Sequence, residues 1–542
     1  MLPEVRRIVE LPRLEGERAG PSPARLASIR RTSAAILRPV QLAALGEVER
    51  CGGLLGIIGV GQGKCLISLL APSMVDCQRP LLLVPPSLLA QTLTERERWA
   101  QLFFLHPALT VLPYSVLSSD RGQQVLDELQ PDFIVADECS RLRRRESGRT
   151  RRLVRWFQEH PDTKGVMLSG TMTARSVVDF DHLAELALRE QSPVPREWLE
   201  TEAWAACMDA RTDAPPTAHQ RAAVAPLVEA FPTLEGTPVA AMYARLRSCP
   251  GVLCTVDTSA AECSLRMEAR RYTPSPELRV ALQELRRTWQ LPDGTELLRA
   301  VDFSAAVRQL QAGFYYRPVW GPDGPNVAWL EARLHWGREV RRVLDLRLPG
   351  VDTPGCVAEY VRQSGPYYRR ALLEAWEAIA DHGPGQEAVW VSDAHLRHVW
   401  GAALRLEAER GPVLVWCEHV ATLDGLAALG MTVCRPGAAL PAVPCTVALS
   451  RPSFGMGTNL QGWATNVVVE PLGNGEAWEQ LLGRTHRPGQ EAEDVLVMVP
   501  YWTHAALAAL HAARADAEYV QGLTGQKQKM LLASWLETWE GV

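Results

Sequence analysis

The sequence lacks the features that mark membrane proteins, secreted proteins and metal-stapled domains. Its apolar stretches, such as residues 52–60, are broken by glycine and are too short to cross a bilayer. The first residues contain no apolar core of a secretion signal. The twelve cysteines include no C-x-x-C pair, which argues against a zinc ribbon and against a disulfide framework. These absences predict a protein of the cytoplasm that has reduced thiols and no membrane partner.

Lysine is also scarce, with four lysines in a chain that otherwise uses arginine for positive charge. The formal net charge is −5, so any DNA contact must come from a local patch and not from a general basic surface. A hydrophobic content of 47% and a charged content of 22% are typical of an ordinary globular protein. A length of 542 residues predicts roughly two to four domains.

Short apolar runs alternate with helical patterns in two regions, which predicts an α/β fold with parallel sheets and crossover helices. The expected strands are 54–58, 81–84, 133–136 and 166–168 in the first region, and 413–416, 446–449, 467–469 and 495–499 in the second. Between these regions, aromatic residues gather at 314–320, Trp329 and Trp336 among helical segments. We expect these aromatic side chains to form the core of a small helical module.

These changes of pattern divide the chain into four parts. Residues 1–212 are expected to form a first lobe, and residues 213–385 to complete it and add a mostly helical insertion. Residues 386–500 are expected to form a second lobe, and residues 501–542 a helical tail. Each expected strand of the first region runs directly into a candidate chemical motif. Because ligands of open α/β sheets bind at the carboxyl ends of strands, this order indicates one shared site.

A glycine-rich turn ending in Lys64 follows the first expected strand and precedes a helical segment at 65–70. Glycines let backbone N–H groups approach phosphate oxygens, and a lysine at this place reaches the terminal phosphates. Upstream, Gln41 places an amide where an adenine edge could be read. Most glycine-rich turns are only turns, so the prediction depends on the motifs that follow. The residues expected to hold ATP are Gln41, Gly59, Gly61, Gly63, Lys64, Cys65 and Gly457.

Two carboxylates, Asp137 and Glu138, end the apolar run that starts at residue 132. ATP hydrolysis needs one carboxylate to hold Mg²⁺, commonly through water, and another to orient or deprotonate the attacking water. Cys65 departs from this scheme, since phosphate loops carry Thr or Ser there as a direct Mg²⁺ ligand. Mg²⁺ prefers oxygen to a soft thiol, so Cys65 is expected to be a weak metal ligand. A site that binds nucleotide but hydrolyses it slowly is therefore an alternative.

Arg484 and Arg487 lie three residues apart on an expected helix end, so both can face the same cleft. Their guanidinium groups could neutralise the charge that develops on a terminal phosphate in the transition state. Gln480 and Gln490 frame the pair, which favours this prediction over a solvated basic turn. The predicted catalytic set is Lys64, Asp137, Glu138, Gln480, Arg484 and Arg487.

Taken in order, these motifs resemble those of superfamily-two motor ATPases of the Swi/Snf-like (chromatin-remodeller-type) class. The segments that carry the resemblance are residues 81–89, 114–118, 137–147, 168–171, 455–461 and 480–490. The resemblance implies two RecA-like lobes in tandem that close on ATP, Mg²⁺ and DNA. It also implies that residues 168–171 are a coupling motif, which links the ATP state to lobe closure. Cys139 and Ser140 replace the usual Ala-His, and residues 470–474 replace a stretch that contains aspartate. Without a chromatin-targeting module, the chain is most similar to stripped bacterial or bacteriophage members.

The resemblance also implies where a DNA backbone would be held. The expected contacts, all hydroxyl, amide or backbone donors suited to phosphates, are Ser87, Tyr114, Ser115, Gly457, Thr458 and Asn459. The run from Arg141 to Arg155 is the densest basic patch of the chain. A charge run is commonly only a solvated face, but beside the acidic pair we favour phosphate contact. The residues predicted to make it are Arg141, Arg143 and Arg144.

The expected function is that of an ATP-dependent DNA translocase that moves along duplex DNA or remodels protein–DNA complexes or branched DNA. The resemblance implies a bacterial cell or a phage-infected host as its setting, with replication or recombination proteins as partners. Two alternatives stay open. One is a helicase that separates strands of DNA or acts on RNA. The other is an ATP-gated DNA clamp whose hydrolysis is weakened at Cys65.

Overall fold

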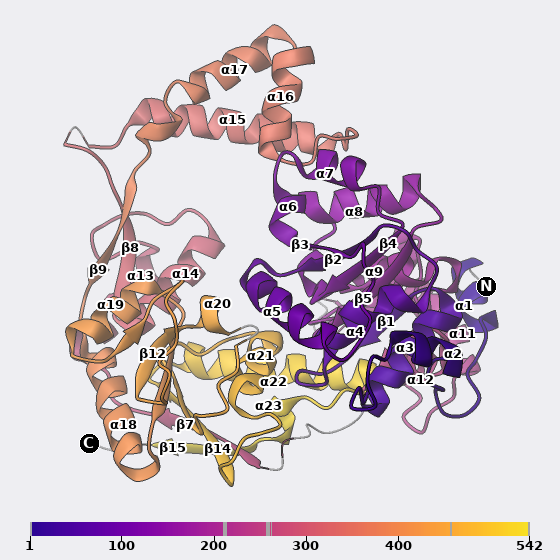
Figure 1. Cartoon of the computed structure of the whole chain (residues 1–542). Coiled ribbons are helices and arrows are strands. Elements are labelled where there is room, and N and C mark those ends of the chain that lie inside the picture. The colour runs from indigo at the N-terminus through magenta and orange to yellow at the C-terminus, as the bar shows by residue number, and fades with distance from the viewer. Residues whose placement is uncertain are drawn as a thin grey trace. The chain divides into compact units, whose positions relative to one another are not determined.

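The computed structural model describes residues 3–209, 214–255, 261, 263–322, 324–455 and 458–539 (Figure 1). The chain divides into two compact units. Unit 1 consists of Met1–Ser259, Val343–Tyr360 and Ala515–Gln528, and unit 2 of Ala260–Arg342, Val361–Arg514 and Lys529–Val542. Among the helices described, none has both the length and the apolar character that a bilayer span requires.

Unit 1 contains a sheet of six strands in the order β3-β2-β4-β5-β1-β6, and all its neighbouring strands are parallel. The strands are β1 (Leu54–Ile57), β2 (Pro80–Val84), β3 (Thr110–Pro113), β4 (Phe133–Asp137), β5 (Lys164–Ser169) and β6 (Val252–Cys254). The four strands predicted for the first region are confirmed. The short strands β3 and β6 were not predicted.

Side chains alternate along these strands and fill two cores, one on each face of the sheet. Leu55 and Ile57 pack into one core, whereas Leu54 and Ile58 pack into the other. A parallel sheet is covered on both faces because its crossover helices return over them. The helices of unit 1 are α1 (Pro3–Glu10), α2 (Pro23–Ile29), α3 (Pro39–Cys51), α4 (Lys64–Leu70), α5 (Leu89–Ala100), α6 (Tyr114–Ser118), α7 (Gly122–Leu129), α8 (Gly148–Glu159), α9 (Asp181–Leu188), α10 (Trp198–Met208), α11 (Ala218–Ala230) and α12 (Pro238–Ser248).

Short 3₁₀ turns complete unit 1 at several strand and helix ends. They are η1 (Ala71–Met74), η2 (Pro86–Leu88), η3 (Cys139–Leu142), η4 (Val177–Asp179) and η5 (Arg189–Gln191). Three helices contribute residues to both units: α15 (Val327–Asp345), α16 (Pro354–Ser364) and α22 (His504–Thr524). The tail predicted to be helical, residues 501–542, contains α22 but also strand β15 (Ser534–Trp539), and the second half of α22 is part of unit 1. Tyr519, Val520 and Leu523 pack there in the same core as Val224 and Leu246.

Unit 2 contains a sheet of seven strands in the order β11-β12-β10-β13-β14-β7-β15, again parallel throughout. The strands are β7 (Ser264–Arg271), β10 (Val413–Cys417), β11 (Val433–Cys434), β12 (Val447–Ser450), β13 (Thr465–Val468), β14 (Asp494–Tyr501) and β15 (Ser534–Trp539). The four strands predicted for the second region are confirmed. Strands β7, β11 and β15 were not predicted.

Unit 2 also contains further helices and an antiparallel pair of strands. The remaining helices are α13 (Pro276–Thr288), α14 (Ala300–Ala312), α17 (Tyr367–Glu377), η6 (Ala380–His382), α18 (Ala394–Arg410), α19 (Val420–Ala428), α20 (Arg451–Phe454), α21 (Gly475–Thr485) and α23 (Lys529–Leu532). β8 (Phe314–Val319) pairs with β9 (Gly385–Trp390). Phe314, Tyr315, Trp329 and Trp336 are buried, as predicted for core residues, but Phe314 and Tyr315 lie on strand β8 and not in a helical module.

Candidate nucleotide site

The glycine-rich turn, which the sequence predicts to be a phosphate loop, joins β1 to α4 in unit 1. Gly61 and Gly63 adopt left-handed φ angles of +86° and +82°, which favour glycine. A Cβ on Gly63 would overlap the amide nitrogen of Gln41. Gln41 is buried, and its Nε2 donates to the Gly63 carbonyl at 3.3 Å while its Oε1 accepts from the Arg38 amide at 2.9 Å. The Gln41 side chain, predicted to read adenine, thus holds the loop with its Nε2 and caps the start of α3 with its Oε1.

Lys64 is the first residue of α4, and its side chain is directed back over the loop. Its Nζ donates to the carbonyls of Ile58 at 3.1 Å and Gly59 at 3.4 Å, and it lies 3.3 Å from Glu138 Oε1. The residue is only 8% exposed. A buried ammonium is stable only when it is paired. Lys64 therefore places a buried positive charge beside the glycine-rich loop, where binding of a terminal phosphate would require one.

The carboxylate pair lies at the carboxyl end of β4. The Glu138 amide donates to Asp137 Oδ1 at 3.1 Å, and Glu138 itself has a left-handed φ of +51°, a costly conformation for this residue type. Burial and, to a smaller extent, the negative charge of Glu138 raise the pKa of Asp137 to about 7. Positive charge would restore the carboxylate form. The pair fits Mg²⁺, which is held by one or two carboxylates together with water and substrate phosphates.

The end of β5 brings a third motif to the same place. Ser169 Oγ donates to Glu138 Oε2 at 3.3 Å, and the Thr171 amide donates to Ser169 Oγ at 3.1 Å. A Cβ on Gly170 would lie 3.4 Å from Lys64 Nζ, so glycine leaves room beside the ammonium. Because β5 lies between β1 and β4 in the sheet, residues 169–171 are held between the phosphate loop and the carboxylates.

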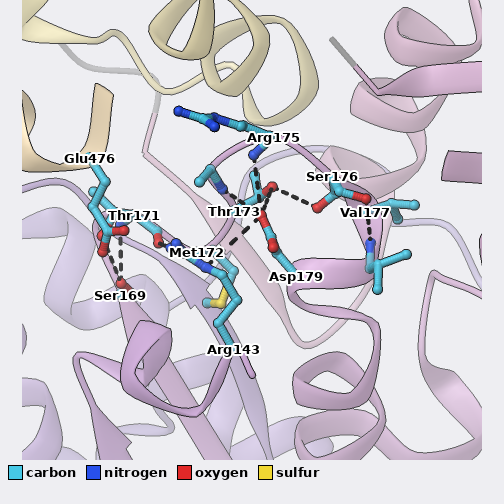
Figure 2. A network of polar contacts seen from close by, with 12 residues as sticks. Arg143, Ser169, Thr171, Met172, Thr173, Arg175, Ser176, Val177, Asp179 and Glu476 are labelled. Atoms are coloured by element: carbon cyan, nitrogen blue, oxygen red, sulfur yellow. Dashed lines mark hydrogen bonds and ion pairs between the residues drawn. The ribbon is translucent and has the colours of Figure 1, made fainter. Parts of the chain in front are cut away.

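The loop that follows this motif is held by a polar network (Figure 2). Arg143 Nη2 donates to the Thr171 carbonyl at 2.7 Å. Asp179 accepts hydrogen bonds from the backbone amides of residues 174 and 175, at 2.8 and 3.2 Å. Arg175 then makes two hydrogen bonds of 2.9 Å to the carboxylate of Asp516. The network ties the coupling motif to the second half of α22 within unit 1.

Cys65 follows Lys64 on α4, where a hydroxyl was expected. Burial raises the pKa of its thiol, and the negative charges of Asp137 and then Glu95 raise it further. The thiol is therefore protonated at neutral pH and close enough to Asp137 to feel its charge. A protonated thiol is a poor ligand for a hard cation, so this position does not fit direct coordination of Mg²⁺.

Replacing Cys65 with threonine is expected to tighten the Mg²⁺ dependence of ATP turnover. A hydroxyl in place of the thiol would add an oxygen ligand, and a gain of roughly 1.4 kcal/mol corresponds to about tenfold in Mg²⁺ affinity. ATP turnover titrated with Mg²⁺ measures this effect. Cys65→Ala, which removes the thiol without adding oxygen, is the control. Identical Mg²⁺ curves for Cys65→Thr and the parent would show that this position does not limit the metal.

The predicted arginine motif lies on and after α21 in unit 2. Arg484 is 5% exposed, and its Nε donates to the Gln480 carbonyl at 3.0 Å. Its Nη1 reaches the Thr458 carbonyl at 3.5 Å, and its own carbonyl accepts from the amide of Leu460 at 3.2 Å. The arginine motif and residues 458–460 are thus packed against each other within unit 2. Arg487, half-buried, follows on the turn after the helix.

The structure places the predicted DNA contacts in different environments. Ser87, Ser115 and Asn459 are exposed, and Thr458 is half-buried. Gly457 lies outside the described residues. Tyr114 is fully buried, and its hydroxyl donates to the Asp137 carbonyl at 2.9 Å. A buried tyrosine hydroxyl needs such a partner, so in this structure Tyr114 supports the carboxylate strand and does not present its hydroxyl at the surface.

Several arginines of the basic run make contacts within unit 1. Arg152 is buried, donates to the Leu117 carbonyl at 2.9 Å and lies 3.4 Å from Asp352, which also pairs with Arg155. Arg143 is bound to the coupling loop, as described above. Arg141 and Arg144 are exposed. Of the three arginines predicted to contact phosphate, these two are the ones whose side chains reach the surface.

Two residues that lie next to the glycine-rich loop were not predicted from the sequence. Thr255, after β6, accepts a hydrogen bond from the Gly59 amide at 3.0 Å. Gln526, after α22, has its Nε2 3.2 Å from the point that a Cβ on Gly59 would occupy. No local pattern marks either residue, because each reaches the loop only through the fold of unit 1.

Comparison with protein-family profiles gives no match to this chain, and comparison with curated proteins gives no significant relative. The function must therefore be inferred from the motifs and from the geometry of each unit.

Proposed function

We propose that this chain is an ATP-dependent DNA translocase of the Swi/Snf-like class, a DNA-dependent ATPase built on two RecA-like lobes. One observation carries the proposal. Lys64 contacts Glu138, and Glu138 contacts Ser169, at the carboxyl ends of β1, β4 and β5. A phosphate-binding lysine, an acidic pair and a coupling serine are the parts that nucleotide hydrolysis needs in one place. Open parallel sheets bind ligands at this edge.

Within this proposal each residue of unit 1 has a separate task. The N–H groups of the loop and the Lys64 ammonium bind the phosphates of ATP. Asp137 would hold Mg²⁺, which when bound would supply positive charge against the phosphate oxygens. Glu138 accepts a proton from the attacking water, and Ser169 reports the state of Glu138 to the loop that Arg143 and Asp179 hold.

Unit 2 would supply the remaining charge. Arg484 and Arg487 are proposed to approach the terminal phosphate when the two RecA-like lobes close on ATP and DNA. The described contacts of Arg484 with Gln480 and Thr458 support a fixed position for the motif inside its own lobe. The 213–385 region would complete the first lobe and add a mostly helical insertion, although its strand β7 belongs to the sheet of unit 2. Replication or recombination proteins of a bacterial cell or phage-infected host are the proposed partners.

A second candidate function is an ATP-gated DNA clamp with weak hydrolysis. The raised pKa of the Cys65 thiol beside Asp137 favours it, because the metal would lose a ligand. Measuring ATP binding and ATP turnover on the same preparation separates the two functions. The translocase turns ATP over faster when DNA is added. The clamp binds ATP tightly and shows no such increase.

DNA stimulation should depend on the two exposed arginines of the basic run. Replacing Arg141 and Arg144 together with glutamate is expected to weaken DNA binding and to reduce the slope of log K against log salt by about one for each lost phosphate contact. DNA affinity at several salt concentrations and DNA-stimulated turnover measure the effect. Arg121→Glu, at an exposed arginine of the same unit outside the run, is the matched control. Equal DNA affinity and salt slope in the double variant and the parent would remove these residues from the interface.

A further inference from the structure

The C-terminal residues of unit 1 form a fixed wall of the candidate nucleotide site. The segment is anchored by Asp516, whose carboxylate pairs with Arg175, and by Leu523 in the core. After α22 the chain turns at Gly525, which has a left-handed φ of +71°. A Cβ there would overlap the ring of Tyr243, so only glycine fits. The turn is thus packed closely against Tyr243, and Gln526 is the residue that follows it.

Gln526 is buried against the phosphate loop with part of its amide unpaired. The residue is 2% exposed, and its backbone is tied to Thr524 Oγ1 and to Gln528 Nε2, each at 3.2 Å. Its Oε1 is buried and has no hydrogen-bond partner among the residues that the structure describes. Leaving such a group unsatisfied costs about 1–3 kcal/mol, and native proteins rarely do so without a ligand or an ordered water.

The Gln526 amide lies beside the residue of the loop that Lys64 contacts. Its Nε2 lies 3.2 Å from the point that a Cβ on Gly59 would occupy, and the Gly59 carbonyl accepts from Lys64 Nζ at 3.4 Å. Gln526 and the ammonium therefore meet the same residue of the loop. Since a phosphate-loop lysine reaches the terminal phosphates, the Gln526 amide lies at that end of the site.

We propose that Gln526 is a positioning residue that holds the attacking water, an inference that rests on the proposed ATPase function. An amide oxygen can only accept a hydrogen bond, so a phosphate oxygen, which has no proton, cannot satisfy it. A water next to the terminal phosphate can. One O–H of this water is directed to Gln526 and the other to Glu138. The water oxygen bonds to the γ-phosphorus, the bond to the bridging oxygen breaks, ADP leaves, and Glu138 accepts the proton.

The test is a comparison of Gln526→Ala and Gln526→Glu with the parent full-length chain. Gln526→Ala is expected to lower kcat for ATP by about tenfold to a hundredfold, the scale of one lost contact to a reacting group, and to leave KM and the affinity for a non-hydrolysable ATP analogue within about twofold. Gln526→Glu keeps an acceptor oxygen and is expected to retain more of kcat than Gln526→Ala. Gln528→Ala, which removes a backbone contact from the same segment, is the matched control.

Three results would overturn the inference. A parental kcat in Gln526→Ala, with an active parent, contradicts it and leaves the proposed function intact. A parallel loss of kcat, analogue affinity and Tm in Gln526→Ala and Gln528→Ala shows that Gln526 only packs the segment. A parent that neither binds nor hydrolyses ATP refutes both the inference and the proposed function.

Discussion

Replacing Lys64 with alanine is expected to abolish nucleotide-dependent activity, lowering ATP affinity by about a hundredfold or more. The ammonium is the buried positive charge of the phosphate loop and the partner of Glu138. Its loss removes the phosphate contact and leaves two neighbouring carboxylates without compensation, and a broken buried pair costs about 3–5 kcal/mol. ATP-analogue binding and steady-state turnover are the measurements.

Lys164→Ala is the matched control for this substitution, because Lys164 is an exposed lysine of the same unit at the start of β5. It is expected to bind and turn over ATP like the parent. The Tm of both variants separates a local loss of binding from unfolding. Parental affinity and turnover in a folded Lys64→Ala protein would show that the glycine-rich loop is only a turn.

Replacing Arg487 with alanine is expected to lower kcat by about a thousandfold while ATP affinity changes little. A guanidinium that acts on the charge of the transition state contributes to the rate and not to ground-state binding, and arginine fingers contribute about 10³–10⁵ in kcat. Arg484→Ala should reduce kcat as well, but it also removes contacts to the carbonyls of Gln480 and Thr458 inside unit 2. Arg487→Ala is therefore the cleaner test.

The matched control for Arg487 is Arg397→Ala, since Arg397 is an exposed arginine of unit 2 that pairs with Asp393 on the surface. Its kcat should equal that of the parent. If Arg487→Ala retains the parental kcat, the proposed approach of this motif to the terminal phosphate is wrong, even if the phosphate loop binds ATP.

The strands that were predicted and those that were missed differ in their chemistry. Apolar runs such as 81–84 are buried on both faces of the sheet. They could be recognised as strands because a short run of adjacent aliphatic residues is typical of a strand in a parallel sheet. β7 was missed because charged residues alternate along it. Arg266 and Arg270 both pair with Glu268, and the strand is fixed by its neighbours β14 and β15. Its identity as a strand comes from tertiary pairing and not from local preference.

The candidate site shows the same division. The sequence could predict that Lys64, Glu138 and Ser169 lie close together because each lies at or after the end of a strand, and the carboxyl ends of strands in one parallel sheet share an edge. The burial of Tyr114 and the internal use of Arg152 could not be predicted. A charge run and a hydroxyl look the same in sequence whether they face DNA or a neighbouring helix. The role of Gln526 could not be predicted because its segment, which belongs to unit 1, is separated in the sequence from the rest of that unit by residues of unit 2.

The most direct test of the proposed motor is ATP turnover by the full-length chain with duplex DNA, with single-stranded DNA, with RNA and without nucleic acid. The proposal predicts that duplex DNA stimulates turnover most and that the stimulation is absent in Lys64→Ala. Turnover that responds only to single strands or to RNA would contradict a duplex translocase. Tight ATP binding with no response to any nucleic acid would contradict the motor itself.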